Sequence, residues 1–486
     1  MNYETITIGV DGLDTVLNGG CLEGRMYLVS GDPGTGKTML GSHFLEAGLE
    51  QGETVLYIHG EETREELRES TAAIGIDIDD AKFLDLGPDT EYFIEDQTYS
   101  LVDPSAVDQT KYTEAIFEAI REIDPDRIVL DPITQLRYVQ NDEGQFRRQI
   151  LSFFRFLKDR DITILATMTP TPDHKFTQEI RSLSDGVIEM SRTRDGRRLE
   201  VGKHRTAGQI DGEHGMNIRD TGIEVFPALI PEGHDQVIGD VKYSSGIEGL
   251  DQLLGGGIEQ NTVTFLSGPT GIGKTTLGAQ FLTVAGERGL NAELYLFEES
   301  VSAFTRRCEA IGLPVTTLRD RGVLSLTPIE PLAFSPEEFA SVLRDDIDEN
   351  DLDVIMIDGL DGYTKAIQGD VETLVRKFHS LTRHLTNDDI TVLVTDEISK
   401  LTGISSATSS NLSYIADNVI FLSYVEMDSS LRSIIGVLKK RTGPFEHTIR
   451  EFELTADGIR IGEPLSGVSG LVQGVTRVKG ESPRKP

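Results

Sequence analysis

Short apolar runs alternate with amphipathic stretches along the chain. In the first half the apolar runs lie at 25–30, 54–58, 127–131 and 161–167. The stretch GQFRRQILSFFRFLKD at 144–159 has the spacing of a helix that buries one face. Fully apolar strands separated by helices are typical of an α/β fold with a mainly parallel, doubly wound sheet. The pattern therefore predicts this fold class.

A late β-hairpin is predicted in each half. Residues 187–205 read VIEMSRTRDGRRLEVGKHR, with Asp195-Gly196 as the turn pair. In the second half, NVIFLSYVEM at 418–427 is followed by RSIIGVLKKR at 432–441. We therefore expect antiparallel strands to extend both parallel sheets.

The two halves of the chain repeat one another. Residues 10–45 are echoed by 247–282, so that Lys274 matches Lys37. Glu298 follows Glu61 at the same separation. Two later landmarks keep nearly that separation, and they pair Asp131 with Asp358 and Lys203 with Lys439. An ordered set of matches in register excludes chance and indicates a tandem duplication.

A chain of 486 residues is too long for one ordinary core, so two or three domains are expected from its length. The predicted first domain covers residues 1–235 and the second covers residues 236–465. Residues 466–486 are rich in Gly, Ser and Val and then basic. This stretch is predicted to be a flexible tail that could dock signalling protein partners.

Each half contains one glycine-rich phosphate loop between an apolar strand and a helix. The sequences are GDPGTGKT and GPTGIGKT. Backbone N–H groups of such a loop cradle phosphates, its lysine reaches the terminal phosphates and its hydroxyl meets Mg²⁺. The predicted nucleotide-binding residues are Gly31, Asp32, Pro33, Gly34, Thr35, Gly36, Lys37 and Thr38 in the first half, and Gly268, Pro269, Thr270, Gly271, Ile272, Gly273, Lys274 and Thr275 in the second.

Metal binding requires a carboxylate in addition to the loop hydroxyl. Asp131 and Asp358 each end an apolar strand, where a carboxylate would lie at the sheet edge beside the loop. The sequence therefore predicts Mg²⁺ ligands at Thr38 with Asp131 and at Thr275 with Asp358. The alternative is that each aspartate only terminates its strand in a turn.

Hydrolysis also requires a general base. The pairs Glu61-Glu62 and Glu298-Glu299 directly follow the second repeated strand. A carboxylate there could activate a water in line with the γ-phosphate. Alternatively, the glutamates serve the dipole of the helix that follows. Their repetition in register, in sequence that has otherwise diverged, favours catalysis.

A basic pair repeats at the end of each predicted hairpin, as Lys203 with Arg205 and Lys439 with Arg441. These side chains are far along the chain from the phosphate loops. A protruding basic pair could reach the nucleotide of a neighbouring subunit and compensate charge there, as an arginine finger does. A solvated strand end or a salt-bridge partner is the alternative.

Acidic side chains dominate the charged positions, with 81 Asp and Glu against 46 Lys and Arg and a net charge of −35. Such a charge repels nucleic acid and anionic membranes unless basic groups cluster locally. Nucleic acid is therefore not expected as a partner. The composition is also typical of a high-salt cytoplasm, so acidity alone argues only weakly against DNA.

The compartment is indicated by what the sequence lacks. Cys21 and Cys308 offer neither a disulfide framework nor a metal pattern, which favours an intracellular protein. The N-terminal stretch MNYETITIGVDGLD has no basic segment or long apolar core of a signal peptide. No run of 18 apolar residues predicts a membrane span. We expect a cytoplasmic protein.

The duplicated set of motifs resembles the KaiC family of tandem RecA-like ATPases, best known from the cyanobacterial clock. The GLD lead-in, the phosphate loop, the double glutamate, the apolar strand ending in Asp and the late Lys-x-Arg all occur twice between about residues 5 and 465. The acidity is similar to that of haloarchaeal proteins. The resemblance implies a signal-transduction ATPase that forms hexameric double rings, with ATP and Mg²⁺ between subunits and basic fingers supplied by the neighbour.

The resemblance also implies autophosphorylation in the second half, on an adjacent Ser and Thr of the family. The matching segment is 405–426, where the acceptors fall on Ser413 and Tyr414. Tyrosine in place of threonine is a departure from the family. When the two halves are aligned, Arg181 of the first half corresponds to Ser413, and Ser182 corresponds to Tyr414.

Two other functions are compatible with a phosphate-loop fold. A RecA- or helicase-type ATPase acting on DNA would need basic loops with aromatic residues facing a channel, and FRRQILSFFRF comes closest while reading as an amphipathic helix. A nucleotide-gated scaffold would bind ATP and hardly hydrolyse it. The glutamate pairs present in both halves argue against the scaffold.

Overall fold

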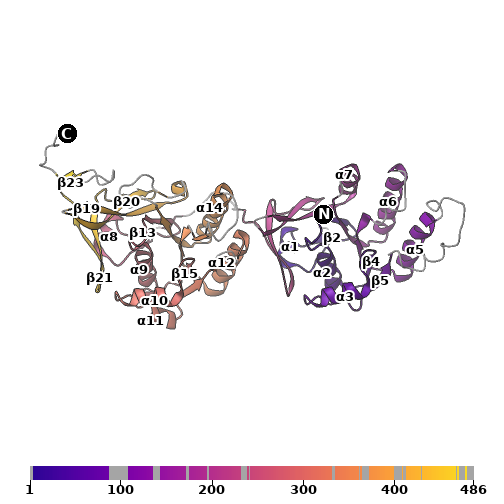
Figure 1. The fold of residues 1–486 in the computed structure, drawn as a ribbon, viewed down its shortest axis with the longest axis horizontal. Helices are drawn as coiled ribbons and strands as arrows, with labels where there is room; N and C mark the ends of the chain where they lie inside the picture. The colour runs from indigo at the N-terminus through magenta and orange to yellow at the C-terminus, as the bar shows by residue number, and fades with distance from the viewer. Residues whose placement is uncertain are drawn as a thin grey trace. The chain divides into compact units, whose positions relative to one another are not determined.

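The chain folds into two compact units, Met1–Ala228 and Leu229–Pro486. Figure 1 colours the first from indigo to magenta and the second on to yellow. The computed structural model describes residues 4–86, 108–134, 143–170, 174–193, 196–230, 238–239, 241–330, 334–360, 362–363, 371–398, 408, 412–427, 429–466, 468–469 and 477–478. The predicted turn residue Asp195 and the predicted boundary at 235–236 lie outside these ranges.

The first unit is built on one nine-stranded sheet. Its strands are β3 (Met26–Gly31), β4 (Val55–His59), β5 (Lys82–Asp85), β6 (Arg127–Asp131), β7 (Thr163–Met168), β8 (Gly186–Thr193), β9 (Gly196–His204), β10 (Glu213–Arg219) and β11 (Gly222–Phe226). They lie in the order β11-β10-β9-β8-β3-β7-β6-β4-β5. The strands from β8 to β5 pair in parallel, whereas β9, β10 and β11 are antiparallel additions.

The second unit repeats this sheet in the order β16-β15-β17-β18-β14-β19-β20-β21-β22. The strands are β14 (Val263–Gly268), β15 (Ala292–Leu296), β16 (Leu324–Pro328), β17 (Val354–Asp358), β18 (Thr391–Glu397), β19 (Asn418–Met427), β20 (Ser430–Lys440), β21 (Arg450–Thr455) and β22 (Gly458–Pro464). Two tandem RecA-like α/β domains, each with a mainly parallel doubly wound sheet and a late hairpin, are thus confirmed.

Helices connect the parallel strands, as Figure 1 shows for both units. The first unit contains α1 (Asp11–Val16), α2 (Lys37–Glu50), α3 (Arg64–Ala72), α5 (Asp108–Ile123), α6 (Glu143–Lys158) and α7 (His174–Leu183). The second contains α8 (Glu248–Leu253), α9 (Lys274–Glu287), α10 (Val301–Glu309), α11 (Val315–Asp320), α12 (Pro336–Asn350), α14 (Val371–Asn387) and the 3₁₀ turn η3 (Leu412–Tyr414).

Short two-stranded ladders complete the described structure. They pair β1 (Thr5–Ile6) with β2 (Cys21–Leu22), β12 (Lys242–Tyr243) with β13 (Ile258–Glu259), and β23 (Val468–Ser469) with β24 (Arg477–Val478). The last ladder lies within the stretch that the sequence predicted to be a flexible tail. That stretch therefore contains some regular pairing.

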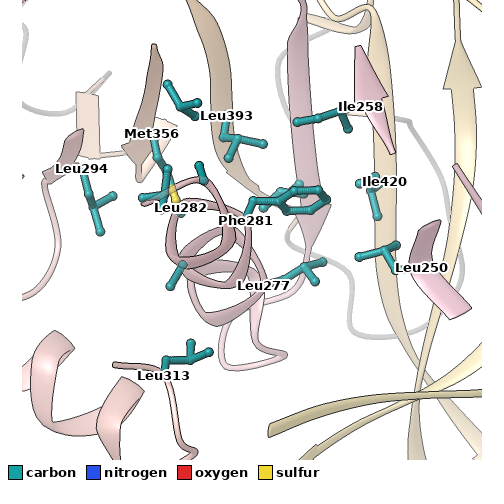
Figure 2. Close-up of a cluster of buried hydrophobic side chains, with 14 of the residues drawn as sticks. Leu250, Ile258, Leu277, Phe281, Leu282, Leu294, Leu313, Met356, Leu393 and Ile420 are labelled. Carbon is teal, nitrogen blue, oxygen red and sulfur yellow. The ribbon is translucent and has the colours of Figure 1, made fainter. Parts of the chain in front are cut away.

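Helix α9 packs closely against its sheet because apolar side chains cover most of its length. Figure 2 shows part of the buried cluster, in which α9 contributes Leu277, Phe281 and Leu282, and the strands contribute Leu294, Met356, Leu393 and Ile420. Gly278 permits the approach, since a Cβ there would lie 2.3 Å from Cε of Met356. Burying such side chains stabilises the fold by about 1.5–3 kcal/mol each. The packing fixes the N-terminus of α9, where the phosphate loop ends.

Candidate nucleotide sites

Each phosphate loop joins a central strand of its sheet to a buried helix, β3 to α2 and β14 to α9. The turn into the helix needs glycine at Gly36 and Gly273, which both have a φ of 106°. Other residues rarely adopt this left-handed backbone. The loops thus present helix N-termini at the carboxyl edge of the sheet, the place where α/β folds bind phosphate groups.

The loop lysines lie across their own loops. Nζ of Lys37 donates to the carbonyl oxygens of Gly31 and Asp32, at 2.8 and 3.0 Å. Nζ of Lys274 donates in the same way to the carbonyls of Gly268 and Pro269, at 2.9 and 3.0 Å. Burial lowers the pKa of both ammonium groups, and nearby carboxylates oppose that shift. The cation is therefore held where terminal phosphates would arrive.

The predicted metal ligands meet in both units. Oγ1 of Thr38 donates to Oδ2 of Asp131 at 2.8 Å, and Oγ1 of Thr275 donates to Oδ1 of Asp358 at 2.8 Å. A hydroxyl and a carboxylate are hard oxygen ligands that suit Mg²⁺, which takes most of its remaining ligands from water and phosphates. Among the described residues no cluster of three or more His, Cys, Asp or Glu is arranged to hold a metal. The hydroxyl and the carboxylate of each pair thus suit a metal that takes its other ligands from water and phosphate.

The two carboxylates that are predicted to bind the metal differ in their hydrogen bonds. Asp358 accepts from Thr275 and Thr395 on the same oxygen, Oδ1, each at 2.8 Å. Asp131 accepts from Thr167 on Oδ1 and from both Thr38 and Tyr57 on Oδ2, with the Tyr57 bond at 3.0 Å. Leu294 takes the place of Tyr57 in the second copy and has no hydroxyl. Sequence reasoning missed this extra donor because β4 reads only as an apolar strand.

The glutamate pairs lie between a strand end and a helix N-cap. Glu61 and Glu62 follow β4 and precede Thr63, which caps α3 in a reciprocal box with Glu66. Burial raises the pKa of Glu62 above its ordinary value, and the charges of Asp131, Glu66 and Glu61 raise it further. A raised pKa of this kind is typical of a carboxyl in a functional site, and here it falls on the second glutamate of the pair.

In the second unit the corresponding carboxyls line a cavity of about 360 Å³ together with the phosphate loop. Its walls include Lys274, Thr275, Glu298, Glu299, Arg307 and Asp358. Burial raises the pKa of Glu299, and Arg307 opposes that shift. Nη2 of Arg307 lies 2.5 Å from Oε1 of Glu299. The structure therefore gathers the predicted loop, metal and base residues of this unit around one space.

The Lys-x-Arg pairs bind backbone within their own unit. Nζ of Lys203 donates to the carbonyls of Arg181, Ser182 and Ser184, at 3.0, 3.2 and 2.5 Å. Nη2 of Arg205 donates to the carbonyl of Ser182 at 3.1 Å. These contacts hold the end of α7. They agree with the alternative in which Lys203 and Arg205 have only a local role within their own unit. A role toward a neighbour's nucleotide stays a prediction.

The second unit repeats this arrangement. Lys439 donates to the carbonyls of Ser413 and Ala416 at 2.5 and 2.6 Å, and Nη2 of Arg441 donates to that of Tyr414 at 2.6 Å. Nη1 of Arg441 also lies 3.2 Å from Asp417. The carbonyl pattern matches Ser413 with Arg181 and Tyr414 with Ser182, as the alignment of the two halves predicted.

The antiparallel strands add residues to the sites that sequence reasoning missed. Arg197 on β9 donates to the carbonyl of Gly34 in the first loop at 2.7 Å. Ile218 on β10 lies against Gly36, and Leu454 on β21 lies against Gly273 and lines the second cavity. Ile218 and Leu454 are separated by the same number of residues as Lys203 and Lys439. This internal repeat was the signal in the sequence that could have identified them.

Two phosphate loops on tandem RecA-like sheets, each with its Thr–Asp pair and glutamates, define the class of tandem phosphate-loop ATPases. The sequence model of the family described as "ATPase: KaiC" matches residues 6–230 and 243–466. The chain therefore belongs to the KaiC ATPase family.

Similar proteins extend along nearly the whole chain. The circadian clock oscillator protein KaiC of a Picosynechococcus species is 27% identical over 96% of this chain and 91% of its own length. KaiC 1 of a Synechocystis species is 27% identical over 97% of this chain, and KaiC of Acaryochloris marina is 28% identical over 96%, each over 91% of its own length. No described helix combines the length and apolar character that crossing a bilayer requires.

Proposed function

We propose that each unit binds Mg-ATP on its phosphate loop and hydrolyses it with a water activated by its glutamate pair. The observation that carries this proposal is the 2.8 Å hydrogen bond between the loop threonine and the strand aspartate, which recurs in both units. It joins two oxygen ligands at the mouth of the phosphate cradle although they lie 93 and 83 residues apart in the sequence.

In this mechanism the chain's own residues bind phosphate, orient it and move one proton. Loop N–H groups and Lys37 or Lys274 hold the β- and γ-phosphates. Mg²⁺, when bound by the Thr–Asp pair, neutralises charge on the phosphate oxygens. Glu61 or Glu298 accepts a proton from the attacking water. Glu62 or Glu299 supports that base from the neighbouring position.

Silencing the sites separately tests the proposal. We expect E61Q/E62Q to abolish hydrolysis in the first unit and E298Q/E299Q in the second, each by ~10²–10⁴-fold, because a general base contributes that much. Binding of a fluorescent ATP analogue should persist, since the cradle is intact. The matched control is E65Q/E69Q, which removes two exposed carboxylates from α3. Unchanged phosphate release after all four active-site substitutions would contradict the proposal.

We infer that the protein works as a cytoplasmic homo-oligomer, a hexameric double ring. The family assignment supports the ring, and the names of the relatives concern the circadian clock. In the ring, Lys203 with Arg205 and Lys439 with Arg441 would approach a neighbour's nucleotide, and the basic tail would offer a surface to signalling proteins. Family and net charge favour this function over a DNA-dependent ATPase.

Autophosphorylation of Ser413 is the second function that we propose. The 3₁₀ turn Leu412–Tyr414 is held by Lys439 and Arg441, which supports a fixed place for the acceptor. In the transfer, Oγ of Ser413 bonds to the γ-phosphorus, the bond to the β–γ oxygen breaks, ADP leaves and Glu298 takes the hydroxyl proton. Tyr414, 48% exposed, is the weaker acceptor because its phenol oxygen lies farther from the backbone.

Phosphopeptide mapping after incubation with Mg-ATP in high salt tests the kinase proposal. We expect phosphate on Ser413 in the wild type, none there in S413A, and a large decrease in E298Q. S423A, which changes a buried serine on β19, is the control for loss of a nearby hydroxyl. Phosphate that appears only elsewhere, or that persists undiminished in E298Q, would contradict it.

A further inference from the structure

One arginine distinguishes the second nucleotide site from the first. Arg307 lies on α10 and lines the cavity formed by the phosphate loop, the glutamates and Asp358. Its guanidinium lies 2.5 Å from the Glu299 carboxylate, and its Cζ lies 5.8 Å from the centre of the Phe304 ring. The arginine is therefore placed by both an ion pair and an aromatic ring one turn back on the same helix.

The first unit has a serine at this position. Helices α3 and α10 begin and end at corresponding residues of the two copies, so Ser70 matches Arg307. Oγ of Ser70 donates to the carbonyl of Leu67 at 3.0 Å, which is a bond within its own helix. A serine is too short to reach the glutamate pair as an arginine does. The two sites therefore differ in the charge of the side chain at this position, although their phosphate loops, aspartates and glutamates repeat.

The ion pair changes what Glu299 can do. The Glu299 side chain is 22% exposed and the Arg307 side chain is 44% exposed, so solvent screens this ion pair in part. Charge-assisted bonds of this kind are short and orient both partners. Arg307 favours the ionised form of Glu299 against the effect of burial on its pKa, and the ion pair holds the carboxylate at the cavity wall. For Glu62, by contrast, the charges that shift its pKa are all carboxylates.

We propose that Arg307 is a positioning residue of the second nucleotide site, which fixes Glu299 at the wall of the cavity. The first site does without this contact, so the two units hydrolyse ATP with unequal carboxylate pairs. In the second unit Glu298 is then the proton acceptor, and Glu299 acts through its fixed orientation and charge. This inference rests on the proposed hydrolysis in the second unit.

The test uses the full chain with the first site silenced by E61Q/E62Q. We expect R307S, which installs the residue of the first unit, to lower kcat by about tenfold, the effect of removing one charge-assisted hydrogen bond. KM for ATP should change by less than about twofold, because Arg307 acts on Glu299 rather than on ground-state binding. R307K should recover part of the rate, since it keeps the charge without the planar fork.

A double-mutant cycle identifies the partner. E299Q alone should lose about as much as R307S, and R307S/E299Q should lose little more than either, because both remove one contact. The acid limb of the pH–rate profile should move to higher pH in R307S, since Arg307 lowers the pKa of Glu299. That shift should be absent once Glu299 is glutamine. A merely structural arginine would not move the limb.

Arg306 supplies the matched control. It is an exposed arginine next in sequence that lines a neighbouring cavity, which shares Glu298 and Glu299 with the nucleotide cavity. The ion pair to Glu299 comes from Arg307, so R306S removes the same charge and leaves that pair in place. We expect R306S to leave kcat and the pH profile unchanged. Additive losses in the cycle, an R307S rate equal to that of its parent, or equal losses in R306S and R307S would overturn the role of Arg307. An E61Q/E62Q parent that releases no phosphate would instead overturn hydrolysis in the second unit.

Discussion

Tyr57 is a single residue through which the proposed metal site of the first unit differs from that of the second. Its hydroxyl bonds Oδ2 of Asp131 at 3.0 Å, the oxygen that also accepts from Thr38. Its ring is buried and stacks on Phe83, with centroids 5.9 Å apart. Because a neutral donor draws electron density from the carboxylate oxygen, Tyr57 competes with a metal for the same lone pairs.

Y57F tests this competition. We expect half-maximal binding of a fluorescent ATP analogue to the first site at a lower Mg²⁺ concentration, measured with the second loop disabled by K274A. The variant should also lose about 1 kcal/mol of unfolding free energy, because one hydrogen bond is removed. Y295F is the control, since its hydroxyl bonds Asp346 at 2.7 Å. An equal Mg²⁺ shift in Y295F would contradict the prediction.

Glu66 influences the glutamate pair of the first site through the charge of Glu62. The pKa of Glu62 is raised by burial first, then by Asp131, Glu66 and Glu61. Removing one like charge lowers that pKa, so Glu62 stays ionised to lower pH. We expect E66Q, in an E298Q/E299Q background, to move the acid limb of phosphate release to lower pH. Glutamine can keep the reciprocal cap with Thr63.

The neighbouring Glu65 provides the comparison for this pH profile. It is exposed and is not among the groups that raise the pKa of Glu62. The acid limb of E65Q should match that of the parent. A limb that moves to higher pH in E66Q, or that moves equally in both variants, would contradict the prediction.

At the scale of elements, each late hairpin holds the segment that precedes its own first strand. Strands β8 and β9 bring Lys203 and Arg205 to the end of α7, and β19 and β20 bring Lys439 to the turn Leu412–Tyr414. A hairpin thus supplies donors to carbonyls that a helix or turn end leaves unpaired. If a neighbour's nucleotide draws the same side chains, these carbonyl bonds must be exchanged for phosphate bonds.

Amide hydrogen exchange tests the hairpin contact in nucleotide-free protein. We expect R441A to increase exchange in peptides covering 412–417, because the carbonyl of Tyr414 and the carboxylate of Asp417 lose their donor. R432A is the control, since Arg432 pairs with Glu451 farther along the hairpin. Unchanged exchange at 412–417 in R441A would show that the turn does not depend on this contact.

The parallel cores were predictable from the sequence because their strands are buried on both faces and read as apolar runs. The run at 127–131 is strand β6, and the helix predicted at 144–159 is α6, Glu143–Lys158. Strands β10 and β21 were missed, because they lie near the sheet edge with partly exposed faces and weak alternation.

The site was predictable where a motif marks it and not where contact depends on folding. The phosphate loops and the residues of the Thr–Asp pairs followed from repeated motifs at strand ends. The Tyr57–Asp131 contact joins residues 74 apart in the sequence. The Glu299–Arg307 pair depends on how α10 leaves its strand. Apolar periodicity carries no information about such polar pairs.

For the whole molecule, the net charge of −35 acts on assembly as well as on solubility. Like-charged copies repel one another, and salt screens that repulsion over a Debye length of about 10 Å at 0.1 M and about 3 Å at 1 M. If the proposed ring forms, a nucleotide shared between its subunits would stabilise it by mass action. Assembly should therefore depend on both salt and nucleotide.

Light scattering tests this dependence. In high salt with Mg-ATP we expect a species near six times the 53.5 kDa chain, and smaller species without nucleotide or at low salt. R441A should weaken the ring if Arg441 serves a neighbour's phosphates, whereas R432A should not. A hexamer that is stable without ATP and unaffected by R441A would contradict the prediction.

The register between the two copies sets a rule for insertions and deletions. From the phosphate loop to the glutamates neither copy has gained or lost a residue relative to the other, although most side chains have changed. Between the glutamates and the strand aspartate the second copy is shorter, since Glu298 lies nearer to Asp358 in sequence than Glu61 does to Asp131. Chain length is thus fixed where loop, helix and base must meet, and variation in length has accumulated after them.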